Sequence, residues 1–130
     1  MSPNPHFKFV ERAPYELGHL LKKLPEHFFS LATATQDQAL IAEAAVQHAT
    51  HAISVLNKGF EALGHTMFLA TSNQEYEMDP DTLTGMCALI SHMAVEAQFL
   101  QETKDNLQFY MHERALGLSN NVEIKKTGKA

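Results

Sequence analysis

The sequence has few of the residues that build disulfides, thiolate metal sites or nucleic-acid contacts. Its 130 residues include one cysteine, Cys87, which excludes an internal disulfide and a zinc site made of four thiolates. Ten Lys and Arg residues stand against fifteen Asp and Glu, so the formal net charge is −5. Because nucleic-acid binders draw their affinity from Lys and Arg on phosphates, we predict no nucleic-acid partner.

Sequence motifs that are typical of many enzymes and cofactor sites are also missing. The chain contains no G-x-x-x-x-G-K-[ST] or G-x-G-x-x-G phosphate loop, no His-Glu-x-x-His metal motif and no glycine-rich elbow for a strained nucleophile. Cys87 lies beside apolar residues of a predicted helix, where a free cysteine is usually a small buried hydrophobe. We therefore predict a non-enzymatic protein without a cofactor.

The overall composition is that of an ordinary soluble domain. Hydrophobic residues make up 45% of the chain and charged residues 19%, which is neither disordered nor membrane-like. The first residues show no basic segment followed by an apolar core, so we expect a protein of the cytoplasm with no membrane partner. Length and composition together predict one domain.

Proline is distributed in a way that favours two long helices. Two stretches of well over thirty residues lack it, on either side of Pro80. Thr35 followed by Gln38 is a capping-box pattern and predicts a helix over 35–70. Asp79-Pro80-Asp81 is a second strong start, and Gly117 a plausible C-terminal cap, so a second helix is predicted over 80–116.

The N-terminal region is predicted to be shorter and broken. Residues 1–12 carry two prolines and are expected to form an extended arm. A short helix begins at Pro14, and Pro25 breaks it before another turn carrying Phe28, Phe29 and Leu31. We predict an all-α domain over residues 1–118, followed by a flexible polar tail over 119–130.

Both long helices carry regular apolar stripes that should pack against each other as an antiparallel hairpin. The first stripe is rich in alanine and predicts a close helix contact; its members are Ile41, Ala45, Ala49, Ala52, Leu56, Phe60, Leu63 and Met67. The second has heptad spacing; its main apolar members are Leu83, Met86, Ile90, Met93, Ala97, Leu100, Leu107 and Met111.

A further set of apolar positions lies outside these stripes. They are Leu40, Val55 and Leu69 on the first helix, and Leu89, Val95, Phe99 and Phe109 on the second. The short N-terminal helix can cover only part of them, so we expect a second copy of the chain to cover the rest in a helical-bundle dimer. Within the heptad stripe, Met86, Met93, Leu100, Leu107 and Met111 are candidates for a dimer contact or an adaptable groove, although ordinary core filling explains them too.

The loop between the long helices concentrates negative charge. Glu75, Glu77, Asp79 and Asp81 fall within seven positions that contain no basic residue. Helix capping accounts for two of them, and a solvated loop is the simplest explanation of the others. Because the loop is at the end of the predicted hairpin, the four are also candidates for an electrostatically steered protein contact.

Histidine is unusually frequent, with eight in the chain. His48 and His51 are three apart, while His65 and His92 each have a glutamate four residues away, so one helix face can present two metal ligands. The Glu-x-x-His pattern occurs once, from Glu16 to His19, whereas di-iron bundles need it on two helices. We predict no metal, and keep these four histidines as candidates for the alternative, a bundle that binds a metal or a small ligand.

These observations favour one function over the others. We predict a helical interaction protein, an adaptor, regulator or inhibitor, that acts by protein–protein binding as a homodimer. Its support is the surplus of apolar helix surface and the exposed acidic loop rather than any catalytic motif.

Overall fold

The chain folds into helices of very unequal length. The computed structural model describes residues 3–26, 28, 34–73, 75 and 77–127, and side chains up to position 113. Its elements are the 3-10 turn η1 (Val10–Arg12) and the α-helices α1 (Ala13–Lys23), α2 (Gln36–Ser72) and α3 (Pro80–Thr127). No strand occurs in these ranges, so the predicted all-α fold with a short helix and a long hairpin is confirmed. Dimerisation stays a prediction.

Both long helices begin where their capping residues predict. The Thr35 hydroxyl accepts a hydrogen bond from the Gln38 amide at 3.1 Å, and the Gln38 side chain accepts one from the Thr35 amide at 3.0 Å. This capping box satisfies two of the amides that a helix start leaves without partners. The Asp79 carboxylate accepts from the Thr82 amide at 3.4 Å, and Pro80 occupies the first helical position.

Two boundaries differ from the sequence prediction. α3 does not end near Gly117 but continues to Thr127, because one glycine costs a helix only about 1 kcal/mol and no proline follows it. The arm is not extended throughout: the Phe7 amide donates to the Asn4 carbonyl at 3.1 Å and closes a turn, and residues 10–12 form a helical turn that leads directly into α1. Phe29 and Leu31 lie outside the described residues.

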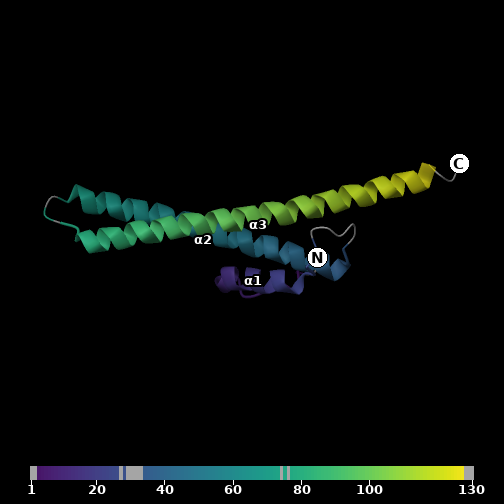
Figure 1. The fold of residues 1–130 in the computed structure, drawn as a ribbon, viewed down its shortest axis with the longest axis horizontal. Helices are drawn as coiled ribbons and strands as arrows, with labels where there is room; N and C mark the ends of the chain where they lie inside the picture. The colour runs from purple at the N-terminus through teal and green to yellow at the C-terminus, as the bar shows by residue number, and fades with distance from the viewer. Residues whose placement is uncertain (1–2, 27, 29–33, 74, 76, 128–130) are drawn as a thin grey trace.

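Figure 1 shows α2 and α3 as a long hairpin with α1 beside the N-terminal part of α2, while the far end of α3 projects beyond the other helices. The core lies where α1, α2 and α3 meet. α2 contributes small side chains that let its neighbours approach closely, as the alanine stripe predicted. The fully buried apolar residues are Ala13, Leu17, Leu20, Phe28, Ile41, Ala42, Ala44, Ala45, Ala49, Ala52, Leu100 and Leu107.

The core stops abruptly partway along the hairpin. On α2 the last buried residue is Ala52, and on α3 the first is Leu100. Between these points the described residues include none that is buried, because only two helices contact each other there. We call residues 53–72 and 80–96 the distal half of the hairpin, and residues 73–79 its tip. Gly59 allows close packing even here: a Cβ on it would lie 3.4 Å from the Met93 methyl group.

The alanine contact predicts a clear difference between two otherwise matched substitutions on α2. Ala49 is fully buried between helices and Ala39 is exposed. Ala49→Leu should lower the free energy of unfolding by about 1–3 kcal/mol through overpacking, while Ala39→Leu should change it by less than about 0.5 kcal/mol. Urea unfolding at one protein concentration measures both. Equal stability of the two variants would contradict the close packing.

Candidate functional site

The acidic residues predicted to mark a partner contact lie together at one end of the molecule. Glu75, Glu77, Asp79 and Asp81 are exposed in the tip and at the start of α3, far from α1 (Figure 1). The Asp79 carboxylate accepts hydrogen bonds from the Thr82 amide and hydroxyl, and no ion pair engages any of the four carboxylates in the described part of the chain. The position therefore agrees with the prediction, and the partner itself stays a prediction.

The heptad stripe of α3 faces α2 within the same chain. Leu100 and Leu107 are fully buried there, and Met86, Met93 and Met111 are half-buried. Met111 packs against the core, and the Met93 methyl group lies where it would contact a Cβ at position 59. Leu100 and Leu107 are thus core residues of one chain, and a role of Met86, Met93 and Met111 in a partner contact stays a prediction.

A single row of α2 residues shows where the hairpin has an uncovered surface. Ile41, His48, Val55, Ala62 and Leu69 are spaced by seven, so each lies only about 20° around the helix from the one before it. Ile41 and His48 are 5% and 0% exposed, whereas Val55 and Leu69 are 54% and 56% exposed, and Ala62 is exposed too. One face of α2 is therefore covered in its first part and uncovered in the distal half.

The start of α1 marks the point at which the cover ends. Val10 and Ala13 line a small cleft together with His51, Val55 and other residues of α2 and α3. From there α1 runs back along α2 toward the N-terminus of that helix (Figure 1). The surface that α1 covers and the uncovered distal surface are therefore successive parts of the same side of the hairpin, which we call the α1 face.

A groove of about 420 Å³ opens at the distal end of the hairpin, next to the tip. Its lining combines the last turns of α2 with the first turns of α3 and includes Met67, Leu69, Met78, Thr82 and Met86. Leu69 belongs to the uncovered row, so the groove continues the α1 face. Sequence reasoning had named Val55 and Leu69 as surplus apolar positions but not Met78, which no helical periodicity marks.

His48 is the one polar side chain among the fully buried residues of the described chain. Its ring lies 4.7 Å from that of Phe7, and neither ring nitrogen has a hydrogen-bond partner. The backbone of Lys8 is near enough to favour the charged ring, but makes no bond of normal geometry. Burial lowers the pKa of His48; the Glu16 charge opposes this change and His51 reinforces it.

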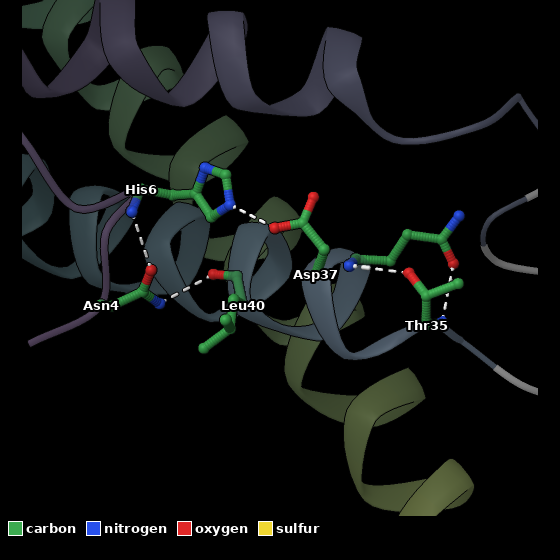
Figure 2. Close-up of polar contacts among 6 residues, drawn as sticks. Asn4, His6, Thr35, Asp37 and Leu40 are labelled. Atoms are coloured by element: carbon green, nitrogen blue, oxygen red, sulfur yellow. Dashed lines mark hydrogen bonds and ion pairs between the residues drawn. The ribbon is translucent and has the colours of Figure 1, made fainter. Parts of the chain in front are cut away.

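The N-terminal arm holds this cover in place through polar contacts to the start of α2 (Figure 2). The Asn4 side-chain amide donates to the Leu40 carbonyl at 2.8 Å, and the Asn4 oxygen accepts from the His6 amide at 3.0 Å. His6 Nε2 lies 2.7 Å from the Asp37 carboxylate. These contacts fix the arm along α2, so that Phe7 packs over His48.

The other three histidines considered as metal ligands do not lie close together. His65 and His92 are exposed on the distal half, while His51 is half-buried near the start of α1. No group of three or more potential metal ligands occurs in the part of the chain that the structure describes. Cys87 is exposed, contrary to the expectation of burial, because it follows Met86 and so points about 100° away from the α2 contact.

One segment of α3 is long and apolar enough to span a membrane. It lies within Pro80–Glu113 and contains an 18-residue stretch with a mean hydropathy of 1.2. Only 6% of that stretch is buried. Core helices of soluble proteins meet the same criterion when they are covered, so the finding is weak evidence for a membrane. It does show that one apolar stretch of α3 has few fully buried residues in a single chain.

Comparison with protein-family models, with curated proteins and with solved structures finds no match to this chain.

Burial of His48 predicts a pH dependence of stability. Its pKa is lowered in the folded state, so below about pH 6.5 the unfolded chain binds a proton that the folded chain does not. The free energy of unfolding should therefore fall between pH 7.5 and 5.5, and fall less in His48→Leu. His65→Leu, at an exposed histidine, should retain the wild-type dependence. Thermal or urea unfolding across this range measures it, and equal slopes for the three proteins would contradict it.

Proposed function

We propose that this chain is a non-enzymatic helical interaction protein of the cytoplasm that binds a second copy of itself through the distal part of the α1 face. The observation that carries the proposal is the row of α2 residues with one spacing and two environments. His48 is buried under the arm and α1, whereas Val55 and Leu69 are more than half exposed. A partner helix on the distal half would continue the cover that α1 provides.

The accessible surface supports association. The chain exposes 9601 Å², whereas a compact protein of 14.5 kDa exposes about 6,900 Å². Two exposed large apolar side chains of the distal half, Val55 and Leu69, lie in the row on the α1 face and would be buried by a partner helix.

A surface of this kind suits an adaptor, regulator or inhibitor. The grooves lined by described residues lie along the helices, where another protein can reach them. The acidic tip is a second contact region, exposed and charged, where a basic surface of another protein would be steered. The alternative of a metal-binding bundle has no ligand cluster in the described residues to support it.

Lysine substitutions at two valines test the proposal. Val55 is 54% exposed in the row on the α1 face, and Val95 is 66% exposed on the side of α3 that points away from α2. Val55→Lys should raise the dimer dissociation constant by at least about tenfold, because a lysine is rarely buried without a partner charge. Val95→Lys should change it by less than about twofold. Sedimentation equilibrium measures both.

Two outcomes would count against the proposal. The first is a wild-type chain that stays monomeric; the second is an equal effect of the two substitutions. Because one segment of α3 is long and apolar enough to span a membrane, cosedimentation with neutral phosphatidylcholine vesicles belongs in the same experiment. Vesicle binding by a chain that forms no dimer would assign the uncovered surface to lipid.

A further inference from the structure

The α1 face presents two different ends to a partner, and this asymmetry bears on how two copies meet. At the start of α1 it carries exposed apolar and basic side chains: Phe9 is 57% exposed, Val10 is 36% exposed, and Lys8 and Arg12 are exposed. At the other end, next to the tip, it carries the groove lined by Met67, Leu69 and Met86. The first end projects side chains and the second receives them.

Charge distinguishes the two possible orientations of a second copy. The tip and the first turn of α3 carry four carboxylates and no basic residue. A parallel pair would bring eight carboxylates together at one end, and like charges that face each other disfavour such an interface strongly. An antiparallel pair separates the tips by the length of the distal half, which is about 30 Å for the 20 residues from Ala52 to Ser72.

The acidic tip of a partner has a more favourable electrostatic neighbour in residues 8–12 than in a second acidic tip. Residues 8–12 sum to +1, from Lys8, Glu11 and Arg12. The Arg12 guanidinium lies 4.5 Å from the centre of the Tyr15 ring and makes no ion pair with any described residue. It is therefore held in place with its charge still available to a partner.

We propose that a second copy lies antiparallel on the α1 face, with the acidic tip of each chain against residues 8–12 of the other. This rests on the proposed function and specifies its partner and geometry. The distal half of the partner then lies end to end with α1, and each groove receives the apolar side chains at the start of the other chain's α1. Phe9, which is 57% exposed, has a left-handed backbone conformation (φ 54°), which is uncommon for a residue other than glycine.

A distance between two tips tests the orientation. A spin label on Ser72→Cys, in a full-length chain that also carries Cys87→Ser, places one probe at the distal end of each copy. Pulsed electron resonance should give about 30 Å for the antiparallel pair. A distance below about 20 Å would show a parallel pair and overturn this inference, while leaving self-association intact. A monomeric mass for the same sample in sedimentation would overturn both proposals.

A charge swap tests the contact between the tip and α1 directly. Arg12→Glu and Glu77→Arg should each weaken the dimer about fivefold at low salt, and the double variant should recover to within about twofold of wild type. Lys22→Glu is the matched control, since it reverses a charge at the other end of α1 and should have no effect. A double variant no better than the single variants, or an equal effect of Lys22→Glu, would overturn the pairing of tip and α1.

Discussion

The structure depends on a mismatch in length between α1 and the hairpin that it covers. α1 has 11 residues, about 16 Å, whereas α2 has 37 residues, about 55 Å. A third helix is what converts a pair of helices into a core, so burial ends where α1 begins. Every fully buried side chain in the described residues lies on the α1 side of this boundary. The distal half is therefore helical and apolar but has no interior of its own.

In the part of the hairpin that α1 covers, the close helix packing that stabilises the fold also buries a polar side chain, His48. Alanines on α2 bring the three helices close together, and the polar arm closes the remaining gap over His48. An imidazole without hydrogen-bond partners in that position is a local cost, offset by the apolar burial around it. Stability and the direction of its pH dependence thus come from one end of the molecule, while the surface available to partners lies at the other.

Much of this architecture could be predicted from the sequence because its signals are local. The capping residues at Thr35 and Asp79 and the proline-free stretches give the helix starts, and the alanine stripe gives the close contact. The end of α3 could not be predicted, because a single glycine is a weak stop. Exposure of Cys87 was missed for a different reason: a one-residue step on a helix changes the face. The groove beside the tip brings together residues from two helices and a loop, which no single periodicity reveals.

The central claim is that a second copy of the chain covers the distal half. Sedimentation equilibrium of the unmodified full-length protein, over a wide range of concentrations at low salt, tests it most directly. The account predicts a mass that rises with concentration from 14.5 kDa to twice that value and then stops, since a closed two-fold pair leaves no further binding site. A mass that stays at 14.5 kDa up to about 100 μM would contradict it.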